Sequence, residues 1–203
     1  GLDGLSLGEI NRTTYEHIYP GGKGINVSVV LSNLGCENKA LGFIAGFTGK
    51  ELEKRMKNLE CQTEFIYVED GMTRINVKIH AEDETEINGQ GPVITEHAME
   101  KLYKIIDNIC DGDTLILSGS VPKTVSEKVY ENILERIKVK QIRVVVDAAK
   151  DLLLNALKYC PFLVKPNKQE LENALNQSLA SDEEVIKAAK HLQEHGARNV
   201  LVS

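Results

Sequence analysis

A glycine-rich loop with one lysine stands directly before an apolar run in the stretch YPGGKGINVSVV. Gly21, Gly22 and Gly24 free the backbone for conformations with φ > 0 and let a ligand approach closely. A helix that begins after them directs its unpaired N–H groups into the loop, which makes a ready site for an anion. Asn26, inside that helix, adds an amide group that suits hydroxyl groups. The stretch predicts either a cradle for an oxyanion or a sugar, or a tight turn before a core helix.

Neither familiar nucleotide-binding glycine motif fits this loop. A P-loop requires G-x-x-x-x-G-K-[ST], whereas Lys23 is followed by Gly24. A dinucleotide fingerprint requires G-x-G-x-x-G, and the sixth place counted from Gly22 is Val27. The loop therefore needs another explanation than these two motifs.

Small polar or charged residues follow four apolar runs in the second half of the chain. From residue 95 onward apolar runs alternate with helical patterns, which predicts a largely parallel sheet covered by helices on both faces. Ligands bind such sheets beyond the carboxyl ends of the strands. The residues at those ends are Ser118–Ser120, Asp147, Lys165–Asn167 and Ser203. We leave Asp147 outside the predicted site, because a carboxylate there can equally hold a helix N-terminus.

The run TRINVKIHAEDETEING, which begins at Thr73, interrupts the alternation of strands and helices. Apolar and polar residues alternate along it, and the acidic EDE is typical of a turn, so we expect a small antiparallel hairpin. One face is expected to be apolar and the other polar and mostly basic. Arg74 could pair with Glu86 across this hairpin or bind a ligand.

Composition excludes several classes of function. The chain has 203 residues, 42% of them hydrophobic, and a net charge of -6, so a nucleic-acid partner is not expected. The longest apolar runs are too short for a membrane span, and we expect no membrane partner and a cytoplasmic location. The four cysteines are unevenly spaced, and we expect reduced, mostly buried thiols.

The stretches GGKGIN, TRIN, SGSVP and KPN followed by KQE, taken in this order, resemble the PfkB (ribokinase-like) family of sugar kinases. Within that family, TRINVKI and ETEINGQGP resemble 1-phosphofructokinases, with tagatose-6-phosphate kinases as near relatives. The resemblance implies an α/β ribokinase-like fold, with a largely parallel sheet and a small antiparallel β lid. We expect a single domain over residues 1–203, with lid segments around 9–20 and 63–90, and a possible homodimer through the lid.

The resemblance also assigns roles to residues. Substrate-binding positions are implied for the glycine loop and its helix, for the hairpin arginine, which would meet the sugar phosphate, and for one strand end. ATP-binding and metal-binding positions are implied for the later strand ends and the helix after KPN. The substrate residues are Gly21, Gly22, Lys23, Asn26, Arg74 and Ser120, the ATP residues are Lys165, Asn167 and Ser203, and the magnesium residue is Glu170. Each has a plainer alternative, such as a solvated loop lysine for Lys23 or a simple turn for Ser118–Ser120.

The implied activity is ATP-dependent phosphorylation of a ketohexose phosphate with Mg²⁺, most simply fructose 1-phosphate to fructose 1,6-bisphosphate. The alternatives are a tagatose-6-phosphate kinase, a non-catalytic sugar-phosphate binding module, and a nicotinamide-dependent oxidoreductase. The Gly-Ala-Gly-Asp element that supplies the family's general base is not among the 203 residues, and neither is its early Asn-Pro-x-x-Asp element. We therefore expect an incomplete chain that is inactive by itself, with the base beyond Ser203.

Overall fold

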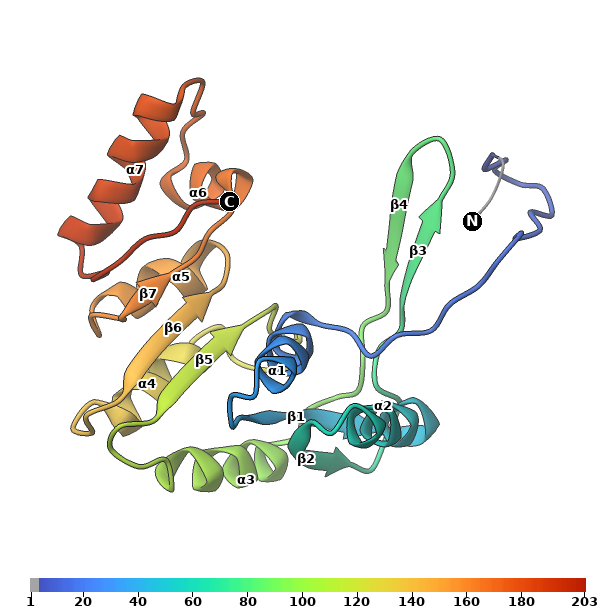
Figure 1. Cartoon of the computed structure of the whole chain (residues 1–203), viewed down its shortest axis with the longest axis horizontal. Coiled ribbons are helices and arrows are strands. Elements are labelled where there is room, and N and C mark those ends of the chain that lie inside the picture. Colours follow the sequence, from blue (N-terminus) through green and yellow to red (C-terminus); the bar gives the residue numbers. More distant parts are fainter. Residues whose placement is uncertain (1–3) are drawn as a thin grey trace. The chain divides into compact units, whose positions relative to one another are not determined.

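The structure, a computed structural model, describes residues 4–203. The chain divides into two compact units, Gly1–Thr95 and Glu96–Ser203, and each is described here by itself (Figure 1). Throughout the described range, no helix combines the length and the apolar character needed to cross a membrane. The expectation of one domain over the whole chain stays a prediction.

The first unit is built around two parallel strands joined by a helix. Strand β1 (Lys39–Ala45) leads into helix α2 (Gly46–Asn58), and strand β2 (Gln62–Val68) returns beside β1. The register pairs Lys39 with Gln62 and Ala45 with Val68. Helix α1 (Lys23–Asn33) precedes this β-α-β unit and contacts β1. A helical crossover brings the second strand back parallel to the first, which is the geometry that such connections favour.

Apolar side chains from both helices and both strands form the core of this β-α-β unit. Met56, fully buried on α2, packs with Ala40 of β1 and with Cys61, which precedes β2. Partly buried side chains from α1, α2 and β2 surround them, namely Ile25, Val29, Leu52 and Phe65. The core therefore packs both helices against the pair of strands.

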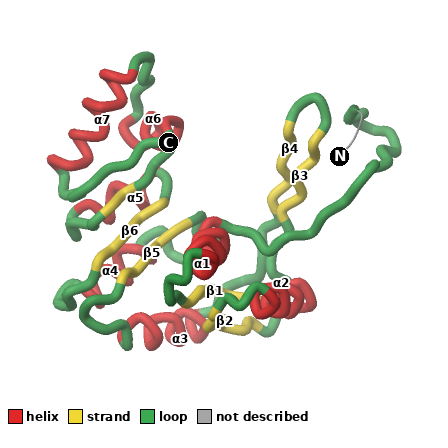
Figure 2. The backbone as a smooth tube through the Cα atoms, in the orientation of Figure 1, coloured by secondary structure: helices red, strands yellow, loops and turns green. Residues whose placement is uncertain are grey.

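The predicted antiparallel hairpin is confirmed, but it is smaller than expected. Strand β3 (Asn76–His80) pairs with strand β4 (Glu84–Asn88), and the two strands lie side by side in Figure 2. Residues 63–68, which we expected in the lid, belong to β2 and pair parallel with β1 instead, because Ile66 and Val68 are buried there. Residues 9–20, also expected in the lid, form no strand.

The second unit confirms the alternation of strands and helices. Strands β5, β6 and β7 form a parallel sheet in chain order, and Thr114 of β5 is in register with Arg143 of β6. One helix connects β5 to β6, and one helix connects β6 to β7. The elements are α3 (Glu96–Asp107), β5 (Thr114–Ser118), α4 (Val129–Ile137), β6 (Arg143–Asp147), α5 (Lys150–Leu157), β7 (Leu163–Val164), α6 (Lys168–Leu175) and α7 (Asp182–Glu194).

The final strand expected at 199–203 is shorter than predicted. Val164 bridges to Val200 in parallel, the Val164 N–H donates to Asn199 O at 3.0 Å, and the Leu201 N–H donates to Val164 O at 3.0 Å. Beyond this bridge the ladder is irregular, because Pro166 has no N–H to donate, although the Ser203 N–H still donates to Pro166 O at 3.3 Å. The unit's core is fully buried on strands and helices alike, at Val146, Val164, Leu153, Leu171 and Leu192.

The cysteines correct one expectation. All four are free thiols, but only Cys61 is buried. Cys36, Cys110 and Cys160 are exposed, whereas Cys61, which also follows a helix, is covered by Met56 and Ala40 in the core of the first unit. The prediction of mostly buried thiols is therefore wrong.

Candidate functional site

The carboxyl ends of three strands meet at one edge of the second unit's sheet. Ser118, the last residue of β5, is paired with Asp147, the last residue of β6. The next strand delivers Lys165, whose N–H donates to Val146 O at 2.9 Å. Because β5, β6 and β7 are parallel and buried, their ends bring these polar residues to the same edge.

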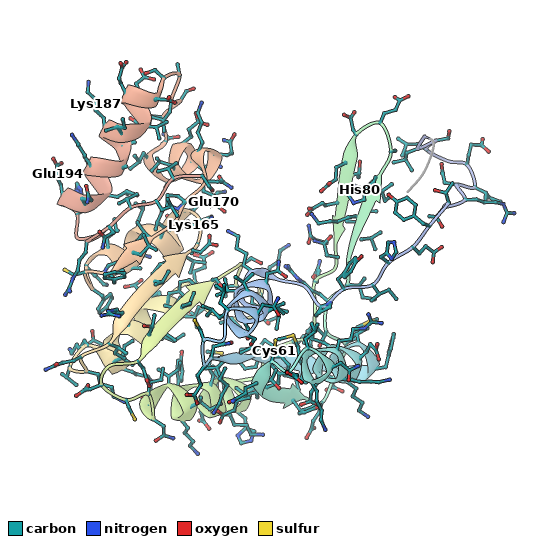
Figure 3. All side chains as sticks on the ribbon, in the orientation of Figure 1. Cys61, His80, Lys165, Glu170, Lys187 and Glu194 are labelled. Carbon is teal, nitrogen blue, oxygen red and sulfur yellow. The ribbon has the colours of Figure 1, made fainter. Side chains whose placement is uncertain are left out.

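Lys165 is the centre of this edge. Its Nζ lies 3.9 Å from Asp147 Oδ2 and 3.5 Å from Ser203 Oγ, and Figure 3 labels its side chain. The Asp147 side chain is only 14% exposed, whereas that of Lys165 is 37% exposed. Both contacts are long, and solvent screens a pair at this exposure, so they hold the ammonium group weakly. An ammonium group held in this way can turn to a phosphate that arrives at the edge.

A buried tyrosine supports the same edge from helix α4. The Tyr130 hydroxyl donates to Gly119 O at 3.4 Å, and the Gly119 N–H donates to Asp147 O at 3.1 Å. Gly119 has φ +93, a conformation that favours glycine, so SGS is a turn with a required glycine. Burial, and secondly the negative charge of Asp147, raises the pKa of Tyr130 to about 12. The hydroxyl therefore keeps its proton even above pH 10, where an ordinary tyrosine loses it, and can keep donating.

Asn167 and Glu170 form the N-terminal cap of α6. The Glu170 N–H donates to Asn167 Oδ1 at 2.7 Å, and the Asn167 N–H donates to Glu170 Oε2 at 2.9 Å. This is a capping box, in which each residue satisfies the backbone N–H of the other. The cap orients the Glu170 carboxylate at the start of a helix that follows Lys165 by three residues.

The donor set at this edge is compatible with magnesium. Mg²⁺ is commonly held by one or two carboxylates together with substrate phosphates and water, rather than by a cage of protein ligands. Within residues 4–203, no group of three or more histidine, cysteine, aspartate or glutamate side chains is arranged to hold a metal ion. Glu170 offers the hard oxygen ligands that a site completed by phosphates and water requires.

In the first unit, the glycine loop ends where helix α1 begins. Gly22 has φ +108 and caps α1, and its carbonyl accepts the Asn26 N–H at 2.9 Å. A Cβ added at Gly21 or Gly22 would meet no heavy atom within 4 Å. The positive φ therefore explains why residue 22 is glycine, and the open space leaves both positions accessible. Lys23 and Asn26 lie in the first turn of this helix, as the sequence predicted.

Arg74 lies at the root of the hairpin, just before β3, and its side chain is exposed. Along the hairpin, Lys78 pairs with Glu86 at 2.5 Å and with Glu84 at 3.1 Å, and these bonds raise the pKa of Lys78. His80, labelled in Figure 3, lies 3.2 Å from Glu84. The polar face therefore carries carboxylates opposite its basic groups, and the expectation of a mostly basic face is wrong.

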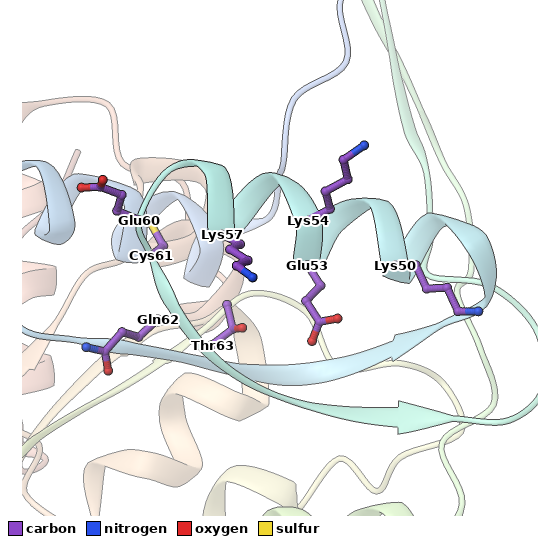
Figure 4. A pocket seen from close by; sticks show the side chains of 8 residues that line it. All are labelled: Lys50, Glu53, Lys54, Lys57, Glu60, Cys61, Gln62 and Thr63. Atoms are coloured by element: carbon purple, nitrogen blue, oxygen red, sulfur yellow. The ribbon is translucent and has the colours of Figure 1, made fainter.

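A hollow of about 600 Å³ between α2 and β2 involves none of the predicted site residues. Figure 4 shows Lys57 of α2 close to Thr63, whereas Lys54 points away from the strands and Lys50 lies at the other end of the helix. The lysines are exposed, and Glu53 and Glu60 stand among them. Nothing in this mixed, open surface singles out a ligand.

The chain matches the model of the pfkB family carbohydrate kinases over residues 2–203. It belongs to this family. It is 41% identical over 202 residues to the 1-phosphofructokinase of Bacillus subtilis strain 168, covering 100% of the chain and 66% of that relative. It is 39% identical over 195 residues to the D-tagatose-1-phosphate kinase of Bacillus licheniformis, covering 96% of the chain and 64% of that relative. The chain thus spans about two thirds of the length of these curated relatives.

Solved structures agree with this family and with the predicted ribokinase-like fold. Phosphofructokinase-2 from Escherichia coli, in complex with fructose-6-phosphate, matches with a TM-score of 0.90 at 27% identity. The match covers 100% of this PfkB-family chain and 68% of that structure. The resemblance drawn from five short motifs is therefore confirmed at the level of the family and the fold.

The structure places the predicted residues of this PfkB-family chain in two sets. Lys165, Asn167, Glu170 and Ser203 lie together around the start of α6, and Ser120 is the last residue of the SGS turn at the end of β5. The loop residues and Arg74 lie in the first unit. Asp147 was recognised at a strand end but left out of the prediction, whereas Tyr130 was missed. The only sequence signal for Tyr130 was a tyrosine on the apolar face of the helix VYENILERI.

Proposed function

We propose that this chain is part of an ATP-dependent kinase of ketohexose 1-phosphates, with fructose 1-phosphate as the preferred substrate and fructose 1,6-bisphosphate as the product. The observation that carries the proposal is 41% identity, along the whole chain, to a relative named 1-phosphofructokinase. The strand-end arrangement around Lys165 supports a nucleotide-phosphate contact.

Phosphoryl transfer leaves the protein mainly to position the reactants and neutralise charge. In this proposal Lys165 leaves its long contacts with Asp147 and Ser203 and binds an ATP phosphate. Asp147 and Ser203 hold the ammonium group near that position in the absence of ATP. Glu170, oriented by its cap, is the residue assigned to Mg²⁺, which when bound would neutralise the phosphate charge.

On the sugar side, Gly21, Gly22 and Asn26 are assigned to the hydroxyl groups, with Lys23 beside them. The open backbone at Gly21 and Gly22 supports a close approach. Arg74 is assigned to the sugar phosphate, since a guanidinium group presents donors in a planar fork that fits a phosphate. Ser120 is assigned to the substrate from the SGS turn. No residue among the 203 is assigned as general base, and residues 1–203 alone are expected to transfer no phosphate.

D-tagatose 1-phosphate is the second candidate substrate, because a relative at 39% identity is named for it. Tagatose 6-phosphate, the alternative expected from the sequence, is named by neither of these two relatives. Fructose 1-phosphate and D-tagatose 1-phosphate both carry a phosphate on carbon 1, so we expect Arg74 to contact that group.

A panel of substrates tests the proposal in the protein that carries this chain. Fructose 1-phosphate, D-tagatose 1-phosphate, tagatose 6-phosphate and fructose 6-phosphate are each assayed with ATP and Mg²⁺, and products are identified by ³¹P NMR. We expect the highest kcat/KM for fructose 1-phosphate and a product with two phosphomonoester signals. Failure of every ketohexose phosphate to bind in calorimetry, or a preference for NAD over ATP, would contradict the proposal.

We also propose that the hairpin pairs with a second copy of the chain. One face of it carries Ile75, Val77 and Ile87, which are about half exposed, and a lone two-stranded hairpin is marginally stable in water. Sedimentation analysis of wild type and of Val77→Lys tests this, since a charge on that face should shift the population toward monomer. An unchanged mass distribution would contradict the dimer.

A further inference from the structure

Thr73 at the root of the β3–β4 hairpin is hydrogen-bonded to the β1–α2 turn. The Thr73 N–H donates to Ala45 O at 2.9 Å, and Thr73 Oγ1 accepts the Ala45 N–H at 2.9 Å. On the other side, Thr48 Oγ1 donates to Thr73 O at 2.8 Å. The backbone donor, the backbone acceptor and the side-chain hydroxyl of Thr73 are therefore all used on the same turn.

Two glycines of α2 make this close approach possible. A Cβ at Gly49 would stand 2.9 Å from Thr73 Oγ1, and one at Gly46 would stand 2.7 Å from Gly71 O. Gly46 also has φ +60, which favours glycine by itself. Ala45 is fully buried, so the hydroxyl of Thr73 satisfies an N–H group that water does not reach.

Arg74 follows Thr73 directly, and the returning strand encloses its backbone from the other side. The Gly89 N–H donates to Ile75 O at 2.9 Å. A Cβ at Gly91 would stand 3.5 Å from Arg74 Cβ, and one at Gly89 would stand 3.7 Å from it. The backbone of Arg74 is thus held on both sides, while its side chain is exposed to solvent.

We propose that Thr73 is a positioning residue for Arg74: its hydroxyl fixes the hairpin root to the β1–α2 turn and so sets where the Arg74 guanidinium group meets the sugar phosphate. The inference rests on the proposed function, which assigns Arg74 to that phosphate. A bidentate contact depends on direction as well as distance, so a root that tilts loses affinity even though the arginine is still present.

Replacing Thr73 with valine is the sharpest test, because it removes the hydroxyl and leaves a side chain of nearly the same shape. The buried Ala45 N–H then has no hydroxyl to donate to, and the root can shift toward solvent to satisfy it. We expect Thr73→Val to weaken fructose 1-phosphate binding about tenfold in calorimetry, with ATP affinity within twofold of wild type. Thr73→Ser keeps the hydroxyl and should stay within about twofold of wild type for both ligands.

Two further variants control this experiment. Thr85→Val makes the same substitution on β4 of the same hairpin, in register with Ile79, and should change neither affinity more than twofold. Thr48→Val removes only the bond to Thr73 O and should weaken sugar-phosphate binding in the same direction, to a smaller extent. If Thr73→Val folds poorly, Thr48→Val still tests whether the contact at the hairpin root affects sugar-phosphate binding.

A double-mutant cycle asks whether Thr73 acts through Arg74. In the Arg74→Ala background, Thr73→Val should cause no further loss of sugar-phosphate affinity beyond twofold. Two results overturn the inference while leaving the proposed function standing: an unchanged affinity in Thr73→Val when Arg74→Ala weakens binding, or an equal loss for sugar phosphate and ATP. An unchanged affinity in Arg74→Ala would overturn the assigned role of Arg74 and this inference with it.

Discussion

The two units hold their candidate binding residues in different ways. In Glu96–Ser203, Lys165 and Asp147 stand at the ends of strands whose preceding residues, Val164 and Val146, are fully buried. In Gly1–Thr95, Arg74 stands at the root of an exposed hairpin that a few polar bonds tie to the β1–α2 turn. A buried sheet tolerates changes in single polar contacts better than such a root does. Substitutions at the two places should therefore have different signatures.

The largest expected difference between the units is in stability. Leu153 of α5 is 0% exposed, and Leu153→Ala should lower the free energy of unfolding by about 2 to 5 kcal/mol. Ile87 of β4 is 57% exposed, and Ile87→Ala should cost less than about 1 kcal/mol. Urea unfolding of both variants measures this, and equal losses would show that the hairpin is buried in solution.

The next prediction separates the ligands of the two units. Lys165→Ala should weaken ATP binding about ten- to hundredfold, because a charge-assisted contact with a phosphate contributes about 1.5 to 3 kcal/mol. Affinity for fructose 1-phosphate should change little. Lys187→Ala, an exposed lysine on α7, is the matched control and should leave both affinities unchanged. Loss of sugar binding with intact ATP binding would mean that the two sets of residues are assigned the wrong way round.

Arg74→Ala should show the opposite pattern. Sugar-phosphate binding should weaken more than tenfold, and ATP affinity should barely change. Lys78→Ala, on the same hairpin but paired with Glu84 and Glu86, is the control and should stay within about twofold. An unchanged Michaelis constant for the sugar phosphate in Arg74→Ala would contradict the assignment of Arg74.

The last prediction concerns Tyr130, and at neutral pH its effect is absent because it appears only at high pH. The pKa of Tyr130 is about 12 in the folded protein, against an ordinary 10.0. Between these values the unfolded chain has lost the proton and the folded protein has kept it, so stability falls as the pH rises, by up to about 1.4 kcal/mol per pH unit. Tyr130→Phe lacks this loss. The free energies of unfolding of wild type and Tyr130→Phe, plotted against pH from 9 to 12, should therefore converge or cross. Parallel plots would contradict the raised pKa.

The parts of the fold that follow from regular patterns were predictable from the sequence. Apolar runs separated by helices gave the parallel sheet, and the alternation of Ile75, Val77 and Ile79 with polar residues gave the hairpin. Residues 63–68 were misassigned because TEFIYV alternates enough to suit either a hairpin or the parallel pair that burial of Ile66 selects. The final strand was overestimated because its length depends on the partner strand β7, which no local pattern reveals.

The parts of the candidate site that could be predicted are those whose contacts join residues close together in the sequence. Asn167 and Glu170 were assigned through the resemblance carried by KPN followed by KQE, and their contact spans only three residues; the strand ends marked Lys165. Tyr130 could not be identified, because its bond to Gly119 O joins a helix to a turn eleven residues away. The role of Thr73 was equally hidden, since its partners Ala45 and Thr48 are 28 and 25 residues distant along the chain.

The chain order of β5, β6 and β7 has a consequence for how the second unit folds. Each parallel pairing joins strands separated by one helix, so every step closes a loop of moderate length and leaves no strand waiting for a distant partner. The sheet can therefore grow strand by strand as the polypeptide leaves the ribosome, with the Val164–Val200 bridge formed last. Pulse-labelled hydrogen exchange during refolding should accordingly protect the amides of β5 and β6 before those of residues 199–201.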